Sequence, residues 1–130
     1  MEFREKQAIY IQITEYICEQ ILLKKWKTGD KIISIRDLAI VMEVNPNTIQ
    51  RAYDYLQQLN IIINKRGIGY FIEQDSESRI LAFRREQFFK NEMPQFFRNM
   101  FLLKINIDDL KIYYTQFLTD NFNNPKDETK

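Results

Sequence analysis

Residues 44–56 read VNPNTIQRAYDYL, a stretch that predicts a well-capped helix with a polar first turn. Asn45 is a good N-cap because its side-chain oxygen can accept a hydrogen bond from an open backbone N–H, and Pro46 suits the first helical position. The apolar residues that follow share one helical face: Ile49, Ala52, Tyr53, Leu56 and Leu59. Local structure leaves four polar residues near the helix start without a role: Asn47, Thr48, Gln50 and Arg51.

Two helices are expected before this one. From Ala8 to about Lys25, apolar residues recur at three-to-four spacing, which is typical of an amphipathic helix. After a short extended run at 31–33, Ser34 and Asp37 form a capping box that opens a second, brief helix ending near Glu43. Only a three-residue turn then separates the second helix from the third.

A β-hairpin is expected after Asn60. Two apolar runs, 61–63 and 70–72, flank a loop that holds Gly67 and Gly69, where positive φ carries no Cβ penalty. Lys65 and Arg66 place two positive charges in the same loop. Helix, short strand, short helix, tight turn, helix and basic hairpin is the order of a winged helix-turn-helix. The fold class is therefore mainly α with a small β-wing (α+β).

The composition excludes most enzyme chemistry. The chain has no histidine and a single cysteine, Cys18, so disulfides, Cys/His zinc sites and His-based triads are excluded, and we expect no enzyme activity, metal or cofactor. Cys18 falls in the amphipathic pattern, which favours an inert packing thiol. The charged start and the lack of a long apolar stretch predict a cytoplasmic protein that does not enter a membrane.

The distribution of charge matters more than the net value of +1. Residues 24–36 carry five basic side chains against one acidic side chain, a basic patch that on its own also fits a lysine-rich helix C-terminus. In a winged helix-turn-helix, the N-terminal residues of the recognition helix reach base edges in the major groove. That helix would begin at Pro46. Asp54, one turn deeper, is unfavourable near phosphate, so we expect contacts to stay within the first turn and a half.

The DNA-contact candidates combine recognition helix, crossing helix and wing. Arg and Gln suit bidentate contacts to guanine and adenine, and a basic wing can follow the sugar-phosphate or the minor groove. Taken singly, Arg51 and Lys65 also fit solvated surface charges. The full set is Ser34, Arg36, Asn45, Asn47, Thr48, Gln50, Arg51, Lys65, Arg66 and Gly67.

The chain resembles the GntR family of bacterial transcriptional regulators, and more closely its small YtrA-type subgroup. The segments that carry the resemblance are AIYIQITEYICEQI (8–21), TGDKIISIRDLA (28–39), EVNPNTIQRAYDYL (43–56) and KRGIGYF (65–71). It is dense over about residues 8–72 and looser over 76–122. It implies a DNA-binding regulator, often a repressor encoded near transporter genes. It also places Arg36, Asn47, Thr48, Gln50, Arg66 and Gly67 at positions that the family uses on DNA.

The remaining chain is rich in aromatic residues. More than half of all aromatic residues follow Glu73, on an expected helix from about Ser78 to Leu103, kinked at Pro94, and on a last helix from about 107 to 122 capped by Asn106. Two helices can hardly bury so many aromatic rings within one chain, and an exposed patch of that size marks an interface. The expected dimer-interface residues are Phe88, Phe89, Phe96, Phe97, Phe101, Tyr114 and Phe117.

These features predict a winged helix-turn-helix DNA-binding domain at 1–74, a helical dimerisation region at 75–122 and a disordered tail at 123–130. The leading interpretation is a dimeric repressor that binds double-stranded DNA at an inverted-repeat operator. By the resemblance, larger GntR relatives carry a separate effector-binding domain, and the residues after Ile72 are too few to form one. A small-molecule effector would therefore bind in a cavity in or beside the dimer helices, and the sequence names no ligand. The alternative is a winged-helix module for protein-protein assembly, in which the aromatic helices are the functional surface.

Overall fold

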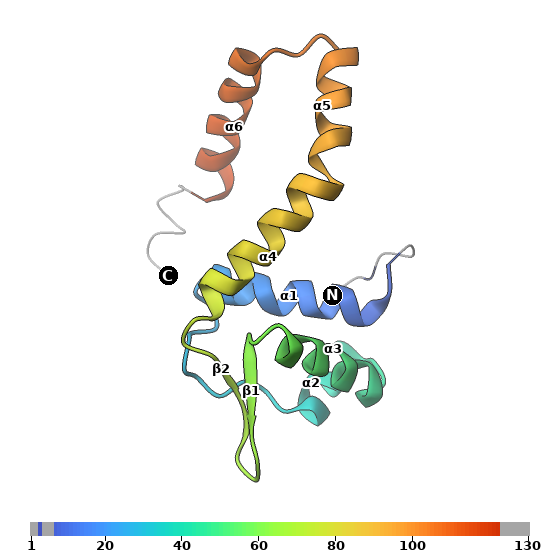
Figure 1. The fold of residues 1–130 in the computed structure, drawn as a ribbon, viewed down its shortest axis with the longest axis vertical. Coiled ribbons are helices and arrows are strands. Elements are labelled where there is room, and N and C mark those ends of the chain that lie inside the picture. Colours follow the sequence, from blue (N-terminus) through green and yellow to red (C-terminus); the bar gives the residue numbers. More distant parts are fainter. Residues whose placement is uncertain (1–2, 4–6, 123–130) are drawn as a thin grey trace. The chain divides into compact units, whose positions relative to one another are not determined.

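The computed structural model describes Phe3 and residues 7–122, and this part of the chain forms six helices and two strands (Figure 1). The elements belong to two compact units, Met1–Arg85 and Glu86–Lys130. The tail expected at 123–130 lies outside the described residues. Among the helices that are described, none has the length and apolar character needed to cross a membrane.

The core of the first unit forms where α1 (Ile9–Leu22) packs on α3 (Pro46–Gln58). Ile13 and Ile17 from α1 and Ile49 and Leu56 from α3 are fully buried there, as the helical spacing predicted. Cys18 lies in the same core, 2% exposed. Burial raises the pKa of its thiol to about 11, so the thiol stays protonated and packs as a small apolar group.

The caps of α2 (Ile35–Met42) and α3 confirm the predicted helix-turn-helix. Ser34 Oγ accepts a hydrogen bond of 3.1 Å from the Asp37 N–H, and Asn45 Oδ1 accepts one of 2.8 Å from the Asn47 N–H. Glu43 ends α2 in the left-handed region, at φ 56°. This residue turns the chain sharply enough for α3 to begin almost at once.

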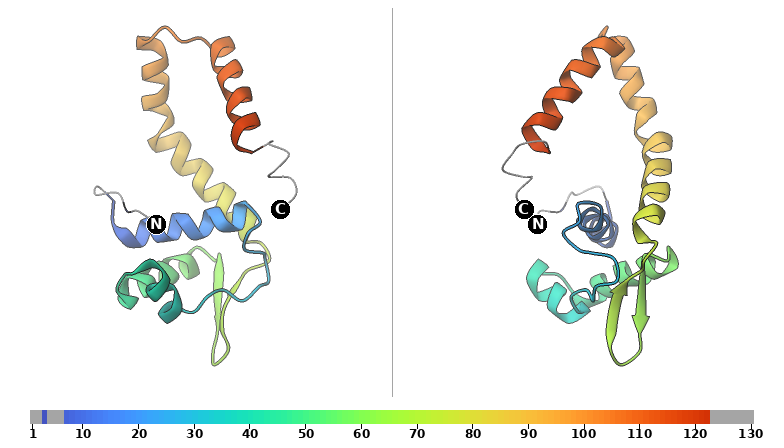
Figure 2. Two further views of the ribbon diagram at one scale, coloured as in Figure 1. Left: turned by 180° about the vertical axis from the view of Figure 1, so that it is seen from behind. Right: turned by 90° about the vertical axis from the view of Figure 1, so that its left-hand side faces the viewer.

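The wing is an antiparallel hairpin of β1 (Ile62–Lys65) and β2 (Gly69–Ile72). Lys65 and Gly69 were expected in the loop, but they form the last pair of the two strands, so the turn is shorter than predicted and spans residues 66–68. The hairpin extends beyond α2 and α3, so its turn stands away from the helices (Figure 2). The short extended run before α2 joins this hairpin, since Lys31 pairs with Phe71 and the Ile32 N–H donates to the Tyr70 carbonyl at 2.9 Å. The wing is thereby attached to the segment that leads into α2.

Tyr53 connects α3 to both of these parts. Its side chain is fully buried, its hydroxyl donates a 2.6 Å hydrogen bond to the Ile33 carbonyl, and its ring meets that of Tyr70 edge-on at 4.9 Å. Burial, and secondarily Tyr70, raises the pKa of its hydroxyl strongly, so it remains a donor. One side chain therefore sets the position of the recognition helix relative to α2 and the wing.

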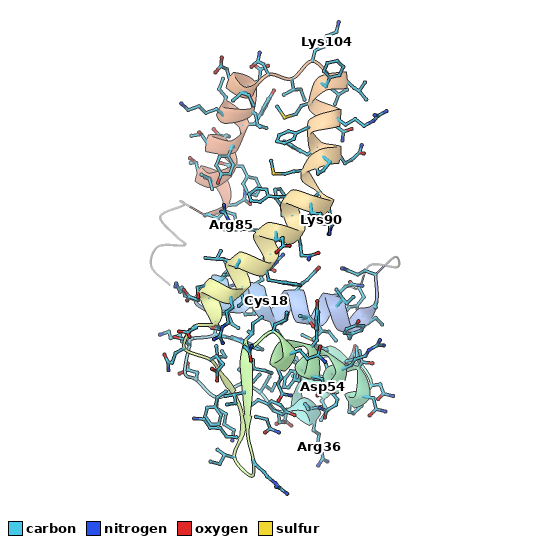
Figure 3. The ribbon with its side chains drawn as sticks, viewed as in Figure 1. Cys18, Arg36, Asp54, Arg85, Lys90 and Lys104 are labelled. Carbon is cyan, nitrogen blue, oxygen red and sulfur yellow. The ribbon has the colours of Figure 1, made fainter. Side chains whose placement is uncertain are left out.

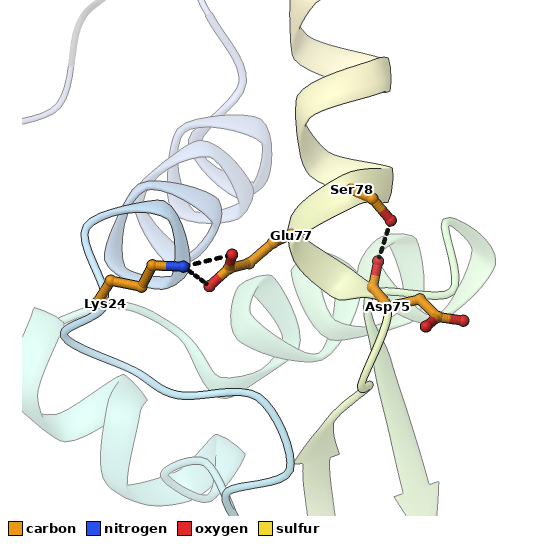
Figure 4. A network of polar contacts seen from close by, with 4 residues as sticks. All are labelled: Lys24, Asp75, Glu77 and Ser78. Carbon is orange, nitrogen blue, oxygen red and sulfur yellow. Dashed lines mark hydrogen bonds and ion pairs between the residues drawn. The ribbon is translucent and has the colours of Figure 1, made fainter.

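The first turns of α4 (Ser76–Asn91) belong to the first unit. Ser76 and Ile80 are buried, and an Arg79 N–H donates to the Asn60 carbonyl at 2.7 Å. Lys24 at the end of α1 pairs with Glu77, and the Ser78 hydroxyl donates to the Asp75 carbonyl (Figure 4). These contacts hold the start of α4 in the first unit. The functions assigned to the regions 1–74 and 75–122 stay predictions.

The second unit holds the end of α4 followed by α5 (Met93–Leu102) and α6 (Ile107–Asn121). The single kinked helix predicted from 78 to 103 is instead two helices, separated at Glu92, with Pro94 in the first turn of α5. Pro94 has no N–H to donate, and its ring conflicts with the carbonyl four residues earlier, so the helix is interrupted. The predicted cap of α6 is confirmed, because Asn106 and Asp109 form a reciprocal capping box.

Candidate nucleic-acid interface

The polar residues at the start of α3 lie where the sequence predicted. Asn47, Gln50 and Arg51 are exposed and Thr48 is half-buried, while the opposite face of the helix is in the core. Together with residues of the first turn of α1, three of them line a shallow hollow of about 320 Å³. The lining residues are Ala8, Ile9, Tyr10, Asn47, Thr48 and Arg51.

Asp54 has a role that the sequence interpretation missed. The Gln50 side-chain amide donates a 2.9 Å hydrogen bond to Asp54 Oδ1, one turn further along α3. This bond orients the Gln50 amide and leaves its carbonyl oxygen and second N–H to meet a partner. The i,i+4 spacing of a Gln and an Asp was a signal that could have revealed the pair. The Asp54 carboxylate thus orients the Gln50 side chain, whereas the sequence had suggested only that it marks where the DNA contacts end.

Arg51 is held by a different helix. Its guanidinium carbon lies 4.1 Å from the centre of the Tyr10 ring, within the range of a cation–π contact. Tyr10 comes from the first turn of α1, far away in sequence. No local pattern pairs these two residues, so only the packing of α1 on α3 reveals the contact.

Ser34 and Asn45 are capping residues as well as contact candidates. Their side-chain oxygens accept the cap hydrogen bonds, which leaves the Ser34 hydroxyl hydrogen and the Asn45 amide hydrogens available as donors. Arg36, by contrast, is exposed on the first turn of α2 and projects on the same side of the first unit as the wing tip (Figure 3). The candidates on the crossing helix and the wing therefore share a side.

The wing tip presents exposed positive charge. Lys65 Nζ lies 4.4 Å from the centre of the Phe71 ring, and Lys65 and Arg66 are both exposed. Gly67 has φ 79°, and a Cβ added there would meet nothing within 4 Å, so its backbone is open to a partner. The Lys31 side chain crosses Gly69 closely. The structure thus brings a lysine of the basic patch to the wing, although it was not among the predicted contacts.

Known proteins share this arrangement. The family model described as bacterial regulatory proteins, gntR family, matches residues 9–72, from the start of α1 to the end of β2. A solved structure described as a transcriptional regulator of the GntR family from Bacteroides thetaiotaomicron is 40% identical, covers 87% of this chain and 98% of its own, and superposes with a TM-score of 0.69. The chain belongs to the GntR family. This GntR-family chain accordingly carries the winged helix-turn-helix of a transcriptional regulator, and not the fold of an enzyme family.

Two relatives from Bacillus subtilis (strain 168) are similar over the same part. The HTH-type transcriptional regulator YhcF is 41% identical over 76 residues, which is 58% of this chain and 63% of YhcF. The HTH-type transcriptional repressor YtrA is 36% identical over 78 residues, which is 60% of each chain. The expected similarity to YtrA-type regulators is confirmed, and the matches span less than two thirds of these relatives.

The second unit exposes an apolar and aromatic surface, in contrast to the polar start of α3. All seven predicted interface residues are exposed, from 44% for Phe96 to 83% for Phe101. No side chain of α6 is buried, although the helix carries Ile107, Ile112, Tyr114 and Phe117. An almost wholly apolar hollow of about 390 Å³ is lined by Phe96 on α5 and by residues of α6: Ile107, Leu110, Lys111 and Tyr114.

Proposed function

We propose that this GntR-family protein is a dimeric, sequence-specific DNA-binding repressor that acts in the cytoplasm on an inverted-repeat operator. The observation that carries the proposal is the start of α3, whose first turn and a half offers Asn47, Thr48, Gln50 and Arg51 on the face opposite the buried apolar one. Such a turn enters the major groove in helix-turn-helix proteins. The similarity to the repressor YtrA supports the direction of regulation.

The candidate contacts divide by chemistry. Arg51 and Gln50 can each form two hydrogen bonds to a base edge, with guanine and adenine respectively, and Asn47 and Thr48 can bond bases or phosphates. Arg36 suits either a phosphate oxygen or a guanine edge. The donors of Ser34 and Asn45 suit phosphate oxygens, which position the protein without reading sequence. At the wing, Lys65 and Arg66 add charge, and the open backbone at Gly67 allows close approach to a groove.

The dimer would form through the second unit. A 15-residue helix such as α6 is marginal in water without tertiary packing, yet its apolar side chains are exposed in the single chain. A second copy would bury them through the same surface on both chains, which is the usual two-fold solution. The residues of this interface are Phe88, Phe89, Phe96, Phe97, Phe101, Tyr114 and Phe117. A small-molecule effector would meet this interface at the apolar hollow beside α6.

The primary test is selection of bound duplexes from a random pool by the wild type and by a Thr48→Ala, Arg51→Ala double variant. A Gln58→Ala, Lys90→Ala variant serves as the control, because it also removes one polar and one basic side chain but leaves the first turn of α3 intact. We expect wild type and control to enrich the same inverted repeat and the double variant to lose it. Enrichment of no duplex by the wild type would refute the proposal.

The assembly-module alternative rests on the exposed aromatic surface, and salt separates the two functions. For a DNA-binding protein, log K falls with log salt by roughly 0.9 per phosphate contacted, whereas an aromatic protein interface responds weakly. Sedimentation at micromolar concentration tests the dimer separately, and a monomer mass would contradict it. A dimer whose weak DNA binding is unaffected by salt and by the α3 substitutions would favour the assembly module.

A further inference from the structure

We propose that Tyr10, on the first turn of α1, is a positioning residue that presets Arg51 for reading a base. The inference rests on the proposed DNA-binding function and extends it to a helix outside the helix-turn-helix. It assigns to α1 a part in sequence recognition in addition to its part in the core.

The contact joins two helices that the core holds firmly together. Arg51 lies over the Tyr10 ring, with 4.1 Å between the guanidinium carbon and the ring centre. The Tyr10 ring also meets Tyr55 edge-on at 6.3 Å, and Tyr55 meets Phe83 edge-on at 6.3 Å. The Tyr10 ring is thus held by further aromatic contacts within the first unit.

A guanidinium that lies over an aromatic ring is held in place and still keeps its hydrogen-bond donors. A contact with a ring face does not consume hydrogen-bond donors, and a planar guanidinium carries five N–H donors, so donors remain available for a guanine edge. Arginine loses much rotamer freedom when a ligand immobilises it, and a side chain already held in place loses less on binding. The contact with Tyr10 therefore strengthens DNA binding, because the Arg51 side chain is already ordered before DNA binds.

Arg51 differs in this respect from its neighbour. Gln50 is oriented by Asp54 of its own helix, so any regular helix would keep that pair. Arg51 depends on α1 lying against α3, so a change in α1 can alter recognition without touching α3. Tyr10 carries no charge, so its loss should weaken specific binding while leaving the salt dependence of binding unchanged.

The experiment measures dissociation constants for the duplex that the wild type selects and for a scrambled duplex of the same length. The proteins are wild type, Tyr10→Leu, Tyr10→Phe, Arg51→Ala and the Tyr10→Leu, Arg51→Ala pair. We expect Tyr10→Leu to weaken binding to the selected duplex about two- to five-fold and Tyr10→Phe, which keeps the ring, to bind as wild type. In the Arg51→Ala background, Tyr10→Leu should have no further effect.

Tyr16→Leu is the matched control. Tyr16 is also a half-buried tyrosine of α1 with an edge-on aromatic contact, to Trp26 at 6.4 Å, but it does not contact Arg51. Its replacement should leave binding to both duplexes unchanged. Thermal melting of each variant separates a loss of folding from a loss of recognition. The Arg51 Nε–H chemical shift reports the stacking itself and should move in Tyr10→Leu but not in Tyr10→Phe.

Three results would overturn the inference while the proposed function stands. They are an equal loss from Tyr10→Leu with and without Arg51, unchanged binding of the selected duplex by Arg51→Ala, and an Arg51 Nε–H shift that does not respond to Tyr10→Leu. Failure of the wild type to select any duplex overturns the proposed function, and this inference with it.

Discussion

The two compact units carry similar apolar side chains but place them differently. In the first unit, isoleucines from α1, α3 and the wing are buried together around Tyr53. In the described part of the second unit only Met100 is buried, while the phenylalanines and tyrosines of α5 and α6 face solvent. The first unit therefore buries its apolar side chains internally, whereas the second leaves an exposed apolar surface that the proposed dimer would cover.

The difference teaches that helix formation and burial are separate properties of a sequence. Caps and spacing specify α6 as well as they specify α3. Only α3 has neighbours that cover its apolar face, because α1, α2 and the wing surround it. In the proposed dimer, α6 would gain its stability from association, because a short helix without packed neighbours is marginal in water.

The largest expected effect comes from removing the centre of the first core. Tyr53→Ala should lower the free energy of unfolding by about 3–5 kcal/mol, because it leaves a cavity and an unpaired Ile33 carbonyl. Tyr53→Phe, which removes only the hydrogen bond, should cost about 1–2 kcal/mol. Urea denaturation followed by circular dichroism measures both, and a cost below about 1 kcal/mol for Tyr53→Ala would show that the first unit does not depend on this residue.

A second test uses Cys18 to report how closed the first core is. The pKa of its thiol is raised from 9.0 to about 11 by burial, so the folded state holds the proton more tightly than the unfolded chain does. Its contribution is complete below pH 9 and is lost as the pH rises towards 11, by about 2–3 kcal/mol. The decline in unfolding free energy over this window should be smaller in Cys18→Ala. Parallel pH profiles would mean that the thiol is open to solvent.

A third test places charge on the second unit. Phe101→Glu and Tyr114→Glu should each weaken self-association by about 2 kcal/mol or more, because a carboxylate would have to be buried at the interface. Sedimentation over a concentration series gives the dimer constant. Gln95→Glu and Gln116→Glu are controls that add the same charge to α5 and α6 at polar positions. The comparison between the units fails if all four variants behave alike, or if the charged aromatics unfold the first unit.

The smallest expected effect is at the start of α4. Ser76 is fully buried, and its hydroxyl has no hydrogen-bond partner within the described part of the chain. Ser76→Ala should therefore change the free energy of unfolding by less than about 1 kcal/mol, in the stabilising direction, because an unpaired buried hydroxyl is removed. Thermal melting gives the sign, and a clear loss of stability would point to a bridging partner such as an ordered water.

Most short-range signals were read correctly from the sequence, although Lys65 and Gly69 were expected in the hairpin loop and instead pair in the strands. The caps Ser34, Asn45 and Asn106 act within three residues, and the two apolar runs on either side of the glycine-containing loop specify the hairpin locally. The interruption at Glu92 was misjudged. An apolar stripe that continued in phase across Pro94 favoured one kinked helix, whereas the missing N–H and the ring of proline ended α4.

Contacts between residues far apart in the sequence could not be predicted from local patterns. That Tyr10 lies beneath Arg51, that Lys31 reaches the wing at Gly69, and that α4 begins inside the first unit all depend on how elements pack. The Gln50–Asp54 pair is intermediate. Its i,i+4 spacing is a local signal in the sequence, but the hydrogen bond itself was seen only in the structure.

The amino-acid sequence was enough to give the order of elements, the fold class and the exposed polar start of the recognition helix, because these follow from residue type and spacing along a few turns of chain. The family came from the resemblance of whole segments between residues 8 and 71. The tertiary structure alone decided which side chains hold the recognition residues and which aromatic side chains remain uncovered. Contacts between distant segments depend on the packing of whole helices, and no local pattern of residues encodes that packing.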